Sequence, residues 1–202
     1  FVATYVHRGS SLSKLGQHQR AIESYDIAIQ LDSEYVQAYR ARGYAYGKLG
    51  HHGQAIESYD QAIDLDPSYG WAYHNRGLSY QNLGQHERAI EDYDNAIQLD
   101  ANESSVYNLR GVAYKKLGQY ERAIEDYDMA IKLDPDHAKA YSNRGNAYGY
   151  LGQYLRSVES YDRAIQIEPS ALRYSRRAYS YEMLGQQKRA IEDYDQAIKV
   201  DS

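Results

Sequence analysis

Residues 104–137 read SSVYNLRGVAYKKLGQYERAIEDYDMAIKLDPDH, and close variants of this stretch fill the whole 202-residue chain. The pair Leu-Gly returns every 34 residues, with one step of 33 before the last copy, and a Tyr stands ten residues before each Leu. Self-similarity at such a period indicates an array of stacked structural repeats. We expect one repeat domain over 1–202, with repeats at 2–35, 36–69, 70–103, 104–137, 138–170 and 171–202.

Each repeat is expected to form two helices. In the quoted repeat the second half places apolar side chains at helical spacing, which predicts an amphipathic helix. Gly118 should end the first helix, because glycine adopts the left-handed conformation that follows many helices at no steric penalty. Asp134 and Pro135 are expected to start the next helix as its N-cap and first residue. The apolar face consists of Ala123, Ile124, Tyr127, Ala130 and Ile131.

The composition favours an all-α fold and removes several functional classes. The chain has 24 Tyr but few β-branched Val and Thr, which sheets prefer. Without Cys it has no disulfide, thiolate metal site or cysteine nucleophile. No apolar run approaches the ~20 residues of a membrane span, and no signal peptide is evident, so we expect a soluble, cytoplasmic protein without a membrane partner. The formal charge of -5 disfavours general nucleic-acid binding.

A spaced set of residues in the fifth repeat resembles the signature of the tetratricopeptide repeat family, and the match recurs along the chain. The resemblance implies a right-handed superhelical α-solenoid of six helix-turn-helix repeats, in which the first helices line a concave groove. It also implies a non-catalytic protein-interaction scaffold that holds a peptide or helix of a partner. The residues that carry it are Tyr141, Gly145, Ala147, Tyr148, Gly152, Tyr154, Tyr161, Ala164 and Pro169.

Every repeat departs from the family pattern by carrying Arg before the small residue of its first helix, from Arg8 to Arg177. An Asp of the preceding repeat should face each Arg from the second repeat onward, which predicts a ladder of ion pairs, since guanidinium binds carboxylates through two hydrogen bonds. The sixth repeat also carries Ala178 where the others have glycine. The expected pairs are Arg42 with Asp26, Arg76 with Asp60, Arg110 with Asp94, Arg144 with Asp128, and Arg177 with Asp162.

Recognition should lie where the repeats differ, on the first-helix positions that line the family's groove. Seven of these positions are basic and one, Glu182, is acidic, so an acidic peptide is the expected ligand. The family's clamp for a terminal carboxylate is present only in fragments, and the complete set is absent. The predicted binding residues are Lys14, Arg40, Tyr44, Lys48, Trp71, His74, Asn75, Leu78, Asn108, Leu109, Val112, Lys115, Lys116, Lys139, Asn143, Tyr150, Arg176 and Tyr179.

No catalytic, cofactor or metal site is predicted. His18, His52 and His86 stand one repeat apart, too far to share a metal ion with bonds near 2 Å. Asp-Tyr-Asp triplets begin at Asp92, Asp126 and Asp193, but residues two apart on a helix point in nearly opposite directions and cannot converge on one ion. The chain is therefore not expected to be an enzyme.

Three further interpretations remain open from the sequence. The chain is consistent with a targeting or regulatory domain of a larger enzyme. RNA binding is a weaker alternative, in which Tyr44, Trp71, Tyr150 and Tyr179 would stack on bases. The apolar stripe at Ala197 and Ile198 is expected to lack the cover that a following repeat gives elsewhere, so a neighbouring chain, associated end to end, or a further helix is expected to cover it, because repeat arrays need polar terminal units.

Overall fold

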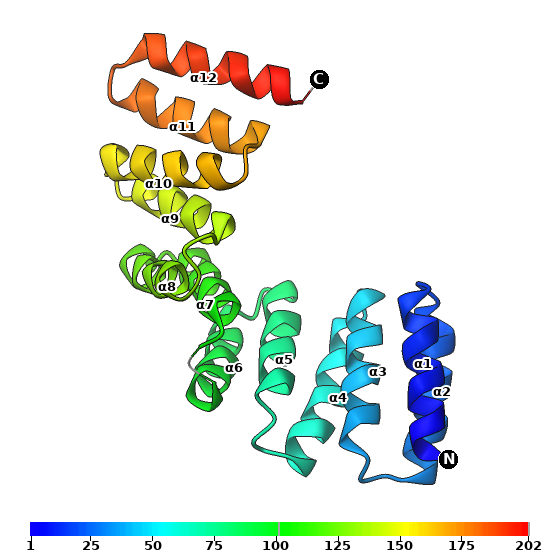
Figure 1. The fold of residues 1–202 in the computed structure, drawn as a ribbon. Coiled ribbons are helices and arrows are strands. Elements are labelled where there is room, and N and C mark those ends of the chain that lie inside the picture. Colours follow the sequence, from blue (N-terminus) through cyan, green and yellow to red (C-terminus); the bar gives the residue numbers. More distant parts are fainter. Residues whose placement is uncertain (101, 202) are drawn as a thin grey trace. The chain divides into compact units, whose positions relative to one another are not determined.

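A computed structural model describes residues 1–100 and 102–201, and across these residues the chain forms α-helices joined by short turns (Figure 1). The expected all-α class is confirmed, and each expected repeat contains one pair of helices. The helices are α1 (Val2–Lys14), α2 (His18–Leu31), α3 (Val36–Lys48), α4 (His52–Leu65), α5 (Gly70–Asn82), α6 (His86–Leu99), α7 (Ser104–Lys116), α8 (Tyr120–Leu133), α9 (Ala138–Tyr150), α10 (Tyr154–Ile167), α11 (Ala171–Met183) and α12 (Gln187–Val200).

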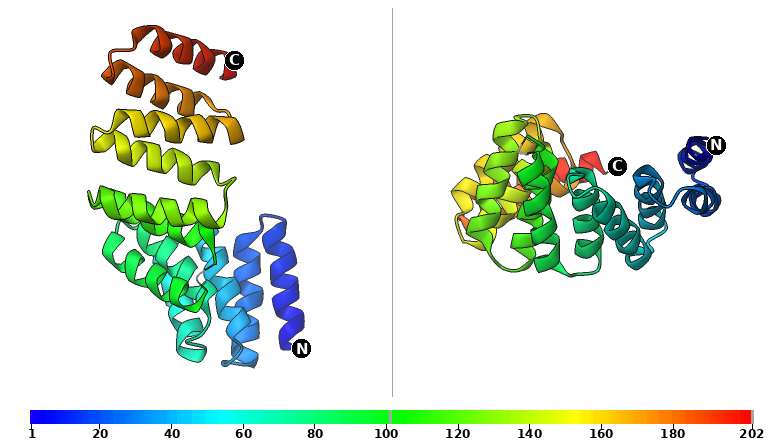
Figure 2. Two further views of the ribbon diagram at one scale, coloured as in Figure 1. Left: turned by 60° about the vertical axis from the view of Figure 1, so that its left-hand side comes forward. Right: turned by 90° about the horizontal axis from the view of Figure 1, so that it is seen from below.

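The chain divides into two compact units, residues 1–101 with α1 to α6 and residues 102–202 with α7 to α12. Within each unit, the second helix of a repeat packs against the first helix of its own repeat and of the next. First helices of successive repeats also touch, α1 with α3 and α3 with α5 in one unit, α7 with α9 and α9 with α11 in the other. In the left view of Figure 2 the helices of the second unit, green to red, follow one another in chain order.

A tyrosine inside each second helix explains the glycine of the first helix. The rings of Tyr25, Tyr59, Tyr93, Tyr127 and Tyr161 are at most 2 % exposed. A Cβ on Gly43 would lie 2.6 Å from Cε1 of Tyr59, so a side chain there would displace a buried ring. In the sixth repeat, where Ala178 replaces glycine, the equivalent Tyr194 is only half-buried.

The structure confirms the predicted ends of the first helices but not the predicted start of α9. Gly118 has φ +75°, and five other glycines at this position in their repeats also have positive φ, which confirms the predicted stop. The predicted start at Asp134 and Pro135 is wrong, because α9 begins at Ala138. Asp134 instead follows the end of α8, and its carboxylate accepts a hydrogen bond from the backbone N–H of Asp136 at 3.1 Å. The Asp-Pro pair therefore builds the turn rather than the helix cap.

The predicted ladder of ion pairs is confirmed at four of its five steps, and the fifth, between residues of the two units, stays a prediction. In each confirmed pair Nη1 of an arginine in a first helix donates to the aspartate of the preceding second helix. The N···O distances are 2.8 Å for Arg42 with Asp26, 2.6 Å for Arg76 with Asp60, 2.6 Å for Arg144 with Asp128, and 2.5 Å for Arg177 with Asp162.

A second partner of each arginine, 16 residues downstream, was not predicted. Arg76 donates from Nε and Nη2 to both carboxylate oxygens of the buried Asp92, at 2.9 and 2.6 Å. Arg42 meets a serine at the same place and donates from Nε to Oγ of Ser58 at 3.1 Å. The first Asp of each Asp-Tyr-Asp triplet thus accepts hydrogen bonds from the arginine of its own repeat. The guanidinium groups of Arg42, Arg76, Arg144 and Arg177 therefore each connect their own helix to the second helix before it and to the one after it.

Side chains of α12 are exposed in part. Ile191 is 61 % exposed and Ile198 67 %, whereas Ala197 is buried at 7 %, so the expectation that Ala197 lacks cover is wrong. Its small side chain is covered within its own unit. End-to-end association through this surface stays a prediction. No helix of the described residues is long and apolar enough to span a bilayer.

Candidate functional site

In the second unit, cations from three successive first helices line one cleft of about 290 Å³. Lys115 comes from α7, Lys139 from α9 and Arg176 from α11. The parallel stacking of first helices brings these distant parts of the sequence together. None of the residues that line this cation cleft is acidic, so it attracts anions.

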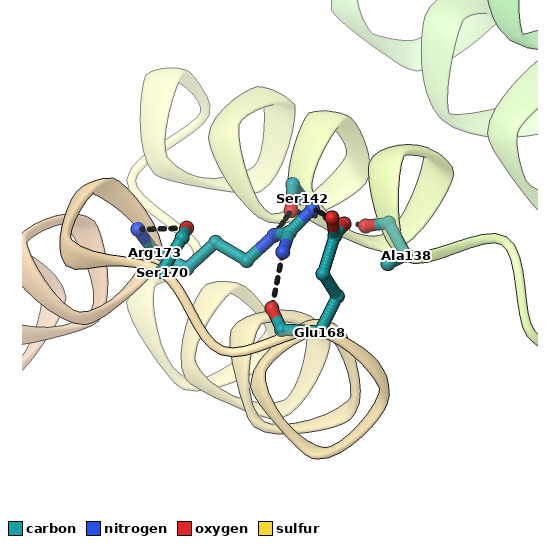
Figure 3. A network of polar contacts seen from close by, with 5 residues as sticks. All are labelled: Ala138, Ser142, Glu168, Ser170 and Arg173. Carbon is teal, nitrogen blue, oxygen red and sulfur yellow. Dashed lines mark hydrogen bonds and ion pairs between the residues drawn. The ribbon is translucent and has the colours of Figure 1, made fainter. Parts of the chain in front are cut away.

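A fourth cation that lines the cleft, Arg173, already has hydrogen-bond and ion-pair partners within the protein (Figure 3). Nη2 of Arg173 donates to Oε2 of Glu168 at 2.6 Å, Nη1 donates to the Glu168 backbone carbonyl, and Nε donates to Oγ of Ser142 at 2.9 Å. The Ser142 hydroxyl in turn donates to the carbonyl of Ala138 at 3.0 Å. The hydrogen bond and charge of Arg173 lower the pKa of Glu168, with a smaller contribution from Lys139. Arg173 therefore ties α11 to α9 instead of offering its charge to a ligand.

Neighbouring positive charges act on Lys115 within the cation cleft. Burial lowers the pKa of Lys115, and the charges of Arg176 and Lys116 lower it further. No ion pair within the described residues joins Lys115, Lys139 or Arg176 to a carboxylate. An anion bound in this cleft would relieve the repulsion, which makes the cleft a favourable place for a carboxylate.

Amide groups complete the floor of the cation cleft. Asn143 donates from Nδ2 to Oδ1 of Asn108 at 3.0 Å, which links α9 to α7. Asn146 also lines the cleft, and its Oδ1 is buried without a hydrogen-bond partner among the described residues. Polar groups of this kind orient a ligand backbone, because a peptide N–H can satisfy a buried carbonyl oxygen.

A second, larger cleft of about 440 Å³ adjoins the first between α9 and α11. Asn146, Leu172 and Arg176 line both clefts and form their common wall. Tyr150 and Tyr179 lie at its sides, and Tyr161 lies beneath. Burial raises the pKa of Tyr161 to about 12, although Arg176 and Asn146 lower it in part, so its hydroxyl remains protonated at neutral pH.

The first unit has clefts of its own on the first helices. One of about 290 Å³ is lined by Lys14, Arg40, Tyr44 and Trp71 among others. The Arg40 guanidinium carbon lies 5.2 Å from the centre of the Trp71 ring, a cation–π contact that holds both side chains. A smaller cleft of about 110 Å³ next to it includes Lys48, Asn75 and Leu78.

Thirteen of the predicted binding residues thus line clefts: Lys14, Arg40, Tyr44, Lys48, Trp71, Asn75, Leu78, Lys115, Lys139, Asn143, Tyr150, Arg176 and Tyr179. Asn108 is buried and accepts a hydrogen bond from Asn143. His74, Leu109, Val112 and Lys116 do not line any of these four clefts. Asn146 and Leu172 also occupy groove positions of the family but were not among the predicted binding residues; the packing of α9 against α11 places both of them in the two clefts.

Comparisons with known proteins agree on the repeat and the fold. Sequence profiles described as TPR repeat match residues 9–50, 49–84 and 113–152, and others described as tetratricopeptide repeat match 70–103, 92–125, 138–170 and 173–202. No curated relative matches the chain.

Solved structures of TPR proteins share its fold. The crystal structure of MamA protein has a TM-score of 0.77 at 25% identity, covering 84% of this chain and 93% of that chain. YrrB is titled a TPR protein with an unusual peptide-binding site. Its structure has a TM-score of 0.74 at 20% identity, and the match covers 89% of this chain and 93% of the YrrB chain. A tetratricopeptide repeat protein from Parabacteroides merdae has a TM-score of 0.74 at 21% identity, and the match covers 100% of this chain and 79% of that protein's chain. On this evidence the chain belongs to the tetratricopeptide repeat family.

Proposed function

We propose that the chain is a non-catalytic scaffold that holds an acidic peptide segment against its first helices, with the cation cleft as the principal contact. The observation that carries this proposal is the convergence of Lys115, Lys139 and Arg176 on one cleft without an acidic lining residue. Repeats of this family serve protein interaction, and a structural neighbour, YrrB, is titled for its peptide-binding site, which supports a peptide ligand.

Charge in this cleft should set the rate and selectivity of binding more than its strength. Lys139 and Arg176 are exposed, and Lys115 is half-buried, so each ion pair with a ligand should contribute only ~0.2 to 1 kcal/mol. Three such pairs acting together give a clear preference for Asp and Glu. Complementary charge also speeds the encounter, in a manner that added salt suppresses.

The experiment compares two charge reversals by fluorescence anisotropy with a fluorescein-labelled peptide of alternating Asp, Glu and Gly. K115E/K139E/R176E alters the cation cleft, and the matched control K132E/K188E/K199E makes the same change in net charge on α8 and α12. Loss of three attractive pairs and gain of three repulsive ones should weaken binding at least about tenfold at low salt. The control should change binding by less than about threefold.

Equal weakening by both triple variants would show a general effect of net charge and contradict the proposal. Unchanged binding in K115E/K139E/R176E would place the ligand elsewhere. A fluorescein-labelled oligouridine run in parallel covers the RNA alternative. Tighter binding of that oligonucleotide than of the peptide, with a steep salt dependence, would replace a peptide by a nucleic acid as the ligand.

A further inference from the structure

The larger cleft between α9 and α11 lies over a position that has no side chain, Gly149. Gly149 stands where the neighbouring repeats carry Lys115 and Glu182. A Cβ on Gly149 would meet only Oγ of Ser157, at 3.7 Å, which is ordinary contact. Helix packing therefore does not require this glycine, in contrast to Gly145, whose Cβ would lie 3.0 Å from the Tyr161 ring. The space above Gly149 is available to a ligand.

Large apolar side chains surround this space and remain exposed. Leu172 is 62 % exposed, Tyr179 53 % and Tyr150 65 %. Tyr150 is nevertheless held in place, because its ring stacks on that of Tyr120 with a centroid distance of 5.0 Å and an interplanar angle of 9°. A wall that is fixed before binding loses little side-chain entropy when a ligand packs on it.

The hydroxyls of Ser157 and Ser180, which line the cleft, have hydrogen-bond partners within the protein. The Ser157 hydroxyl donates to the carbonyl of Gly145 at 2.8 Å and is hydrogen-bonded to Oγ of Ser180 at 2.9 Å. Both serines are buried. Since these two hydroxyls already have partners, an apolar group placed above them leaves neither of them unsatisfied.

The two clefts share Asn146, Leu172 and Arg176, so a ligand in one extends directly into the other. We infer that the bound segment carries a bulky apolar side chain next to its acidic residues, and that this side chain inserts over Gly149 while a carboxylate meets Lys115, Lys139 and Arg176. This inference rests on the proposed acidic ligand and adds its specificity determinant. The site selects an acid and an aliphatic or aromatic neighbour together.

The test uses a set of fluorescein-labelled acidic peptides in which one Leu is moved through a run of Asp and Glu, each paired with the same peptide carrying Ala. The best Leu peptide should bind about five- to tenfold more tightly than its Ala partner. In G149L the new side chain fills the cleft, so this advantage should disappear while the Ala peptide binds as before. G47L is the matched control, because Gly47 occupies the same repeat position on α3 and also has open space around it.

The results separate this inference from the function on which it rests. If acidic peptides bind and K115E/K139E/R176E weakens them, but Leu and Ala peptides bind equally or G149L keeps the Leu advantage, the inference is overturned and the acidic site stands. Loss of the Leu advantage in G47L would also overturn it. If no acidic peptide binds the native chain, the proposed function fails as well. Far-UV circular dichroism of each variant verifies that the helices are retained.

Discussion

Replacing Arg76 by methionine should destabilise the first unit far more than the same change at Arg42. Arg76 holds the buried carboxylate of Asp92 through two hydrogen bonds, and Asp92 is only 3 % exposed. Leaving such a charge without its partner costs about 3 to 5 kcal/mol. Loss of the second, more exposed pair with Asp60 adds ~0.2 to 1 kcal/mol.

Arg42 provides the matched control because its downstream partner is the neutral Ser58. R42M removes one hydrogen bond worth about 1 kcal/mol and an exposed pair with Asp26 worth ~0.2 to 1 kcal/mol. No buried charge is left behind. The contributions of the two more exposed pairs cancel, so we expect R76M to lower the free energy of unfolding by about 2 to 4 kcal/mol more than R42M does.

Trp71, the single tryptophan, gives a local signal for this measurement. It lies on α5 with Arg76, and its ring packs against Tyr59 and Tyr69 at centroid distances of 6.0 and 6.2 Å. Urea unfolding is followed by its fluorescence and by circular dichroism, since repeat arrays lose repeats singly. R76M/D92S, which installs the serine of the second repeat, should restore stability to the level of R42M. Equal losses in R76M and R42M would refute the stranded-charge argument.

Two further predictions concern pH and packing. Burial raises the pKa of Asp92 and Arg76 offsets part of that rise, so in R76M the folded acid binds its proton more tightly than the unfolded one. The stability of R76M should therefore recover as the pH falls from 7 toward 3.8, the ordinary pKa of an aspartic acid. Urea titrations at several pH values measure this recovery. G43A should destabilise by about 1 to 3 kcal/mol because it displaces Tyr59, whereas G47A, in open space on the same helix, should stabilise by about 0.4 to 1 kcal/mol by thermal unfolding.

Most of the fold was predictable because six repeats carry the same residues at the same spacing. The Leu-Gly spacing located the helix stops, and the register of Arg76 against Asp60 followed from counting across one turn. The role of Asp92 was not predicted, because helical periodicity shows that it points away from Asp94 but not which arginine it meets. The restriction of this position to Ser or Asp, always 16 residues after the arginine, was the signal that would have revealed it.

The sequence predicted which side of the first helices carries the binding residues, but not the clefts that these residues form. Groove positions of the family placed Lys115, Lys139 and Arg176 on the first helices, but their convergence on one cleft depends on how α7, α9 and α11 pack. The adjoining space over Gly149 is a missing side chain, and a sequence does not distinguish a glycine needed for packing from one that leaves room. That distinction required the distances to neighbouring atoms.

Chemical-shift mapping of the full ¹⁵N-labelled chain with an acidic peptide tests the central claim most directly. On titration with the alternating Asp-Glu-Gly peptide, the account predicts the largest backbone amide shifts at Lys115, Asn143, Asn146 and Arg176, diminishing as salt is added. Shifts confined to the second helices α8, α10 and α12, or spread evenly over the chain, would contradict it.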